Sequence, residues 1–228
     1  MNDMKTSSAA TPPAACGMQS AKLQNDRETL RIGLYGGTFD PPHIGHVRLA
    51  EAFYNEIKPA RFYIVPDYLP PHKALADKSA SAEQRCEMCR IAFEGIGEVS
   101  SWETDQHRTS YTVETVSHFS RLFPGSEILL LVGDDMISTF TRWYKYQEIL
   151  RSCTLVAADR SGIGAEALDK LCRTLELEER DAKIIRLRAE PIVVSSSQIR
   201  QNCAEGTGLA GLVTDGVAKY ITENGLYE

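Results

Sequence analysis

The chain has 228 residues, of which 43% are hydrophobic, and a formal net charge of −6. This length and composition predict one globular domain with a sizeable core. The acidic balance argues against a nucleic-acid or membrane-surface protein, and no apolar run is long enough to span a bilayer. Six cysteines in a chain of this length do not make a disulfide framework, so we expect reduced thiols and a cytoplasmic protein.

Residues 1–28 differ in composition from the rest of the chain. They are rich in Ser, Ala, Thr, Pro and Gln, show no hydrophobic periodicity and lack the apolar core of a secretory signal. We therefore expect a disordered tail over 1–28, followed by a folded domain over 29–228.

The stretch from Leu30 to His46 combines a strand, a glycine turn and the start of a helix. Apolar residues alternate up to Tyr35, Gly36–Gly37 break the alternation, and helical spacing begins after His43. Such a turn lets backbone N–H groups approach an anion at the positive end of a helix. His43 and His46 are three residues apart, so they share one helix face. The pattern indicates chemistry on a phosphate.

Strands and helices alternate along the remainder of the chain. Strands are predicted at 61–66, 97–102, 127–133, 154–158, 183–187 and 191–194. Helices are predicted at 81–93, from a cap at Ser110 or Thr112, after Asp135, at 165–177, from 195 onward and at 215–224. This alternation is typical of a doubly wound α/β fold with a parallel sheet, whose first two strands form a right-handed βαβ unit.

Polar residues follow two of these predicted strands. The loop at 70–73 presents one imidazole and one ammonium group, and its spacing alone is typical of a surface loop. Asp134 and Asp135 follow the continuous apolar strand at 127–133. Because ligands of open α/β sheets gather at the carboxyl ends of strands, either aspartate could bind ribose hydroxyls, and acidic helix capping explains them equally well.

Two further residue pairs suit either a structural or a functional role. Cys86 and Cys89 form a CxxC motif in the middle of a predicted helix, without a second Cys or His pair at zinc-finger spacing, which favours a structural role. Trp143 and Tyr144 are neighbours within a segment that we predict to be helical. Neighbouring residues cannot share one helix face, so we expect one of the two rings to face a ligand.

The motif from Gly36 to His46 resembles the signature of the HxGH nucleotidylyltransferase superfamily, and its Asp-Pro-Pro-His form is similar to the bacterial nicotinate-nucleotide adenylyltransferase family. The resemblance extends from Leu30 to Glu228. It implies a Rossmann-like parallel sheet with a small C-terminal helical part. It also implies adenylyl transfer from ATP to nicotinate mononucleotide in NAD biosynthesis, giving nicotinate adenine dinucleotide and pyrophosphate. Mg²⁺ would accompany ATP, without a metal site in the chain itself; nucleic acid and membranes are not expected partners, and a homo-oligomer is left open.

The resemblance also assigns roles to individual residues. It places ATP against Gly36, Gly37, Thr38, Phe39, His43, His46, Asp135, Ser196, Ser197 and Arg200. It places the mononucleotide against Lys73, Thr112, Trp143 and Tyr144, with the pyridine on Trp143 and its carboxylate on the backbone N–H groups of Thr112 and Tyr144. Catalysis falls to His43, His46, Lys73 and Arg200, which would position the phosphates and stabilise charge. Asp134, Val194 and Ser197 depart mildly from the family pattern.

Three other functions compete with adenylyl transfer to nicotinate mononucleotide. The same superfamily includes adenylyltransferases and cytidylyltransferases with other phosphate acceptors, such as phosphopantetheine. A dinucleotide-binding dehydrogenase would require GxGxxG after the first strand, and Gly33, Gly36 and Gly37 do not have that spacing. A metal-binding module built on HxxH and CxxC is the third alternative.

Overall fold

The computed structural model describes residues 29–71 and 76–228, and within these ranges six strands form one parallel sheet. The strands are β1 (Arg31–Gly37), β2 (Arg61–Pro66), β3 (Glu98–Val99), β4 (Glu127–Gly133), β5 (Thr154–Ala158) and β6 (Ile184–Leu187), in the order β3-β2-β1-β4-β5-β6. Every neighbouring pair is parallel. The doubly wound α/β fold is therefore confirmed. The chain reverses its direction of travel across the sheet between β1 and β4, and ligands bind at such a switch point.

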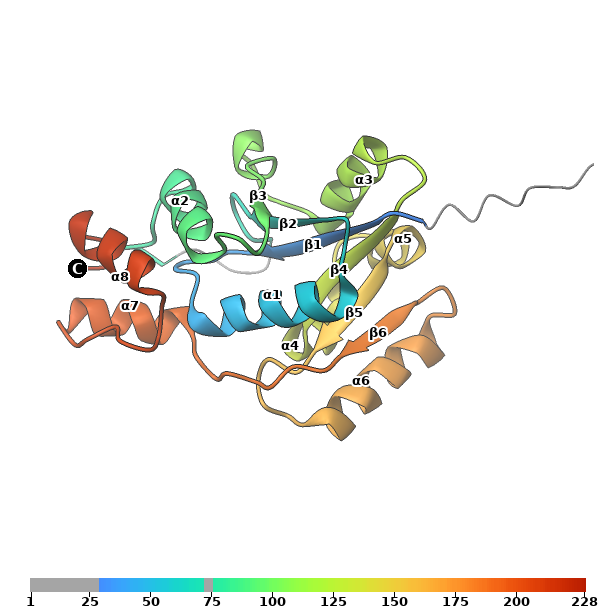
Figure 1. Cartoon of the computed structure of the whole chain (residues 1–228). Helices are drawn as coiled ribbons and strands as arrows, with labels where there is room; N and C mark the ends of the chain where they lie inside the picture. Colours follow the sequence, from blue (N-terminus) through green and yellow to red (C-terminus); the bar gives the residue numbers. More distant parts are fainter. Residues whose placement is uncertain (1–28, 72–75) are drawn as a thin grey trace, which may run out of the picture.

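Helices cover both faces of the sheet (Figure 1). They are α1 (Ile44–Ile57), α2 (Ala82–Ala92), α3 (Thr112–Leu122), α4 (Asp134–Ile137), α5 (Tyr146–Ser152), α6 (Ala165–Glu178), α7 (Ser196–Ala204) and α8 (Asp215–Glu223), with short 3-10 helices η1 (Thr104–Gln106) and η2 (Phe140–Arg142). The helices α7 and α8 form the C-terminal helical part, at the end of the sheet where β1 gives way to α1 (Figure 1).

The core lies on both sides of the central strands. Leu129 and Leu131 of β4 pack with the apolar face of α1, whereas Ile128 and Leu130 pack with α3, α5 and α6. A strand buried on both faces needs a continuous apolar run, which is the pattern that β4 shows. Because β4 pairs with β1 in parallel, its carboxyl end lies beside the turn that follows β1.

Five expectations about local structure are wrong. Gly36 and Gly37 form no turn: they are the last two residues of β1 and pair with β2, so the turn begins at Thr38. Residues 191–194 form no strand: Pro191 has no N–H to donate, Val194 donates to the nearby Ile192 carbonyl, and Val193 is 75% exposed. The predicted strand 97–102 is reduced to β3. Neither Ser110 nor Thr112 caps α3: its N-cap is Tyr111, without a side-chain bond, and Ser110 Oγ accepts from the Tyr68 N–H instead. Trp143 and Tyr144 lie between η2 and α5 rather than in a helix.

No helix in the described ranges is both long enough and apolar enough to cross a membrane.

Gly33 allows two aromatic rings to pack across the centre of β1, which leads to a stability prediction. In Gly33→Ala the new Cβ would lie 2.5 Å from Cε1 of Phe53 and 2.8 Å from Cδ2 of Phe62. Overpacking of this kind should lower the free energy of unfolding by about 1–3 kcal/mol, measured by urea unfolding. Gly208→Ala is the control, because its Cβ would meet no heavy atom of the described chain within 4 Å. Equal midpoints for the two variants would contradict this packing.

Candidate active site

His43 and His46 cap the first turn of α1 reciprocally. The His46 N–H donates to Nδ1 of His43 at 3.4 Å, and the His43 N–H donates to Nδ1 of His46 at 3.2 Å. The two rings stack with their centroids 3.6 Å apart. Since both Nδ1 atoms accept hydrogen bonds, each neutral imidazole carries its proton on Nε2, on the far side of the ring.

The surroundings keep both imidazoles neutral. Burial, with a smaller contribution from the charge of Arg160, lowers the pKa of His43 to about 4. The pKa of His46 is lowered well below its usual value, first by burial and then by His43 and Arg160. At neutral pH each ring therefore offers one uncharged N–H donor, which can bind a phosphate oxygen without exchanging a proton.

Gly45 makes room for this cap. A Cβ at this position would lie 2.8 Å from the Ile192 carbonyl oxygen and 3.1 Å from Nδ1 of His43. A larger residue would push the first turn of α1 away from the 191–194 segment and disturb the imidazole pair.

The turn between β1 and α1 contains one residue in a costly conformation. Phe39 has a φ of 49°, a left-handed value that costs a non-glycine residue on the order of 1–3 kcal/mol. Its buried ring packs edge-to-face on Tyr35, Phe93 and His46, at centroid distances of 5.4, 5.6 and 5.0 Å. The core thus fixes the shape of the turn.

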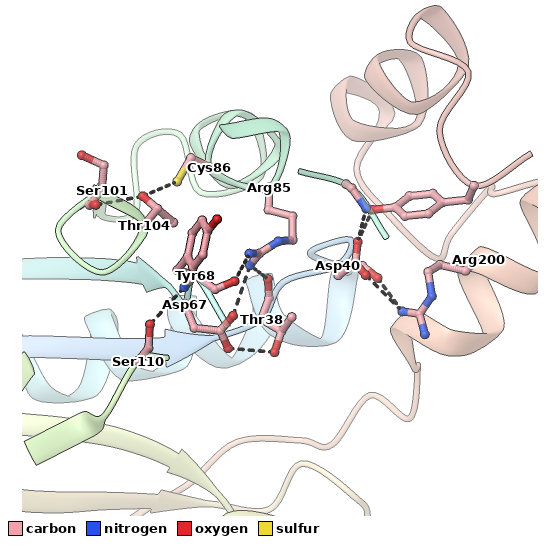
Figure 2. A network of polar contacts seen from close by, with 12 residues as sticks. Thr38, Asp40, Asp67, Tyr68, Arg85, Cys86, Ser101, Thr104, Ser110 and Arg200 are labelled. Atoms are coloured by element: carbon pink, nitrogen blue, oxygen red, sulfur yellow. Dashed lines mark hydrogen bonds and ion pairs between the residues drawn. The ribbon is translucent and has the colours of Figure 1, made fainter. Parts of the chain in front are cut away.

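The start of α7 is attached to the same turn, as Figure 2 shows in part. Arg200 donates from Nη1 to the Asp40 carbonyl at 2.7 Å and from Nη2 to Ser197 Oγ at 3.1 Å. Ser196 Oγ donates to the Pro41 carbonyl at 2.9 Å. The structure therefore brings the three residues predicted at the start of α7 to the turn between β1 and α1.

The side chain of Asp40 connects the turn to two other segments. Its Oδ1 accepts from the Ala80 N–H at 3.1 Å and from the Tyr227 hydroxyl at 2.8 Å. A contact between residues 187 positions apart cannot be read from local sequence patterns, so Tyr227 was not predicted.

The two aspartates after β4 have different environments. Asp134 is buried, and its Oδ1 accepts from the N–H groups of Arg160 and Ser161 at 2.7 and 2.9 Å, which ties the end of β4 to the end of β5. Asp135 pairs with Arg160 at 3.1 Å through Oδ2, and its buried Oδ1 has no hydrogen-bond partner among the described residues. Asp134 therefore serves the fold, whereas the Asp135 side chain is 32% exposed beside Arg160.

Three of the four residues predicted for the mononucleotide, Thr112, Trp143 and Tyr144, are described, and they come from two adjoining segments. The Tyr144 ring is exposed and contacts Tyr111, with ring centroids 4.8 Å apart, so the start of α3 adjoins the segment after η2. Trp143 is half-buried and stacks on Phe140 at 4.9 Å. Neither the Thr112 N–H nor the Tyr144 N–H donates to another described residue. These two N–H groups are the donors that the predicted carboxylate contact requires.

Lys73 lies outside the described residues, so its assignment stays a prediction. Cys86 and Cys89 are buried on α2, with Cys86 Sγ 3.6 Å from Thr104 Oγ1. Burial raises the pKa of the Cys89 thiol well above its usual value. Within residues 29–71 and 76–228, no group of three or more His, Cys, Asp or Glu side chains is arranged to hold a metal ion. The structural interpretation of the CxxC motif fits these surroundings.

Comparisons with known proteins agree with this geometry. The cytidylyltransferase-like family model matches residues 34–202. A probable nicotinate-nucleotide adenylyltransferase of Rubrobacter xylanophilus is 34% identical over 200 residues, covering 87% of this chain and 92% of the relative. The chain belongs to the nicotinate-nucleotide adenylyltransferase family. A probable member from Marinobacter nauticus is 34% identical over 207 residues, covering 85% of this chain and 95% of that protein.

The fold of this family member also resembles solved structures. The nicotinic acid mononucleotide adenylyltransferase of Plasmodium falciparum, complexed with NaAD, superimposes with a TM-score of 0.67 at 16% identity. The match covers 87% of this chain and 97% of that protein. At this identity the likeness concerns the fold alone.

Three residues near the site, Arg85, Asp67 and Arg160, were not predicted from the sequence. Arg85 is completely buried although it lies on a helix with many charged residues. Asp67 and Arg160 follow the carboxyl ends of β2 and β5, a position that the rule for open sheets could have singled out. No local signal marked Arg85.

The depressed pKa of His43 gives a pH prediction. Between pH 6.5 and 4 the unfolded chain binds a proton at this residue that the folded chain does not, so the free energy of unfolding falls as pH falls. A shift of this size corresponds to roughly 3 kcal/mol. His43→Asn keeps a capping acceptor but removes this titration, so its loss of stability between these pH values should be smaller by about that amount. The measurement is urea unfolding at several pH values, and an unchanged pH dependence would contradict the assignment.

Proposed function

We propose that this chain transfers the adenylyl group of ATP to nicotinate mononucleotide, giving nicotinate adenine dinucleotide and pyrophosphate, as a step of NAD biosynthesis. The observation that carries the proposal is the reciprocal cap of His43 and His46, which uses both Nδ1 atoms as acceptors and leaves each neutral imidazole a donor at Nε2, at the end of the turn after β1. Family membership supports the choice of reaction.

On the ATP side, the triphosphate lies along the turn and the start of α1. The positive end of the helix and the two imidazole donors favour phosphate oxygens there. Arg200 adds a positive charge from α7, and the partly exposed Asp135 carboxylate, paired with Arg160 at 3.1 Å, is the acceptor for a ribose hydroxyl. Mg²⁺ enters as the metal complex of ATP, with oxygen ligands from the phosphates and water.

The chemical step requires no general base. A phosphate oxygen of the mononucleotide, already ionised at neutral pH, forms a bond to the α-phosphorus of ATP, and the bond from that phosphorus to the bridging oxygen breaks. Both electrons of the broken bond leave with pyrophosphate. The protein contributes positioning and stabilisation of charge on the phosphates. Neutral donors suit this task because they hold the α-phosphate without protonating the nucleophile.

On the acceptor side, the free N–H groups of Thr112 and Tyr144 offer hydrogen-bond donors only. A carboxylate only accepts hydrogen bonds, whereas an amide also donates. The NH₂ group of nicotinamide would therefore face another donor. The half-buried Trp143 supplies an aromatic face that either pyridine ring can use.

Pyrophosphate release from ATP tests the proposed function and its substrate preference. Each mismatched buried group costs about 1–3 kcal/mol, so kcat/KM should be roughly tenfold to a hundredfold lower per contact for the nicotinamide mononucleotide. Trp143→Ala should raise KM for both mononucleotides with little change in their ratio.

Equal use of the two mononucleotides would contradict the donor-only pocket. Release with phosphopantetheine but with neither mononucleotide would move the chain to another acceptor within the superfamily.

A further inference from the structure

The guanidinium of Arg85 binds two backbone carbonyls and one carboxylate beside the turn between β1 and α1 (Figure 2). Nη1 of Arg85 donates to the Thr38 carbonyl at 2.7 Å and to Asp67 Oδ1 at 3.3 Å, and Nη2 donates to the Tyr68 carbonyl at 3.0 Å. The Arg85 side chain is 0% exposed. It reaches from α2 to the turn after β1 and to the loop after β2, so one buried cation joins three segments.

Thr38 is held from two sides by this network. Its carbonyl accepts from Arg85, and its hydroxyl donates to Asp67 Oδ2 at 2.9 Å. The Asp67 N–H in turn donates to the Gly37 carbonyl at 3.0 Å. Asp67 is buried beside Arg85, so the two charges compensate each other inside the protein.

The contact between Arg85 and the Thr38 carbonyl also fixes the direction of the Phe39 N–H, because both groups belong to one peptide. In a trans peptide the C=O and the following N–H lie in one plane and point in opposite directions. Because the Thr38 carbonyl is drawn toward Arg85, the Phe39 N–H points away from it. This N–H donates to no other described residue, and Phe39 adopts its left-handed conformation at the same peptide. The turn therefore presents a fixed, unused donor.

We propose that Arg85, supported by Asp67, is a positioning residue for adenylyl transfer: it orients the Thr38–Phe39 peptide so that the Phe39 N–H faces the triphosphate. The proposal rests on the function proposed above. Arg85 does not touch the substrate in this account. It acts through the peptide that does.

The planar guanidinium of arginine suits the positioning of this peptide better than the single ammonium group of lysine. The guanidinium reaches three acceptors on two segments through two nitrogens, whereas a lysine at residue 85 would hold only part of that set. Loss of the arginine has a second effect, because it leaves the buried Asp67 carboxylate without its partner. A useful experiment must separate lost orientation from this uncompensated charge.

The test compares Arg85→Met with the double variant Arg85→Met/Asp67→Asn, which removes both charges and keeps an oxygen for the Thr38 hydroxyl. Thermal unfolding reports stability, and pyrophosphate release reports kcat and KM. Arg85→Met should lose both stability and kcat. The double variant should regain most of the melting temperature, while kcat stays lower on the order of a hundredfold and KM for the mononucleotide changes little, as expected when a transition-state donor is misplaced.

Arg90→Met is the matched control on the same helix. Arg90 is exposed and pairs with Glu87 at 2.9 Å, so its loss removes a helix ion pair without touching the turn. Its kcat should equal that of the wild type. If the double variant regained kcat together with stability, Arg85 would be only structural and the proposal would be overturned. Retention of full kcat by Arg85→Met would overturn it equally.

An NMR readout keeps this test independent of the reaction. The Phe39 amide resonance of the wild type should shift on addition of α,β-methylene ATP, and the shift should be much smaller in the double variant. A wild type that releases no pyrophosphate with either mononucleotide would contradict the proposed function, whereas the amide shifts would still decide the role of Arg85. Equal shifts in the wild type and the double variant would overturn that role.

Discussion

The reciprocal cap of His43 and His46 is the interaction on which the rest of the site depends. Each imidazole accepts from the backbone of the other through Nδ1, so the protein fixes both tautomers before any ligand arrives. Burial keeps the rings uncharged and leaves two Nε2–H donors beside the positive end of α1. Preorganised donors of this kind stabilise developing charge without reorganisation during the reaction.

The turn that carries this cap is short, and segments distant in the sequence hold it in place. Arg85 from α2 binds the Thr38 carbonyl, Arg200 from α7 binds the Asp40 carbonyl, and Tyr227 binds the Asp40 side chain. These contacts, with the buried ring of Phe39, offset the left-handed backbone at that residue. The C-terminal part therefore completes the frame around the turn, because Arg200 lies on α7 and Tyr227 follows α8 (Figures 1 and 2).

The parts of this structure that rest on local patterns could be predicted from the sequence. The alternation before Gly36, the helical spacing after His43 and the apolar run of β4 each reflect short-range periodicity. The predicted strand at 191–194 failed because apolar content alone does not supply a neighbouring strand, and the Val194 N–H donates to the Ile192 carbonyl within the segment instead. Arg85 escaped prediction because its partners lie 17 to 47 positions away, and only the folded sheet brings them together.

The proposed function requires that the two imidazoles and the turn after β1 bind the triphosphate. The most direct measurement is a crystal structure of the chain with the non-transferable analogue α,β-methylene ATP. If this site binds the triphosphate, phosphate oxygens will lie within hydrogen-bond distance, about 2.7–3.2 Å, of Nε2 of His43 and His46 and of the Phe39 nitrogen. A triphosphate bound elsewhere, with both Nε2 atoms in contact only with water or protein, would contradict it.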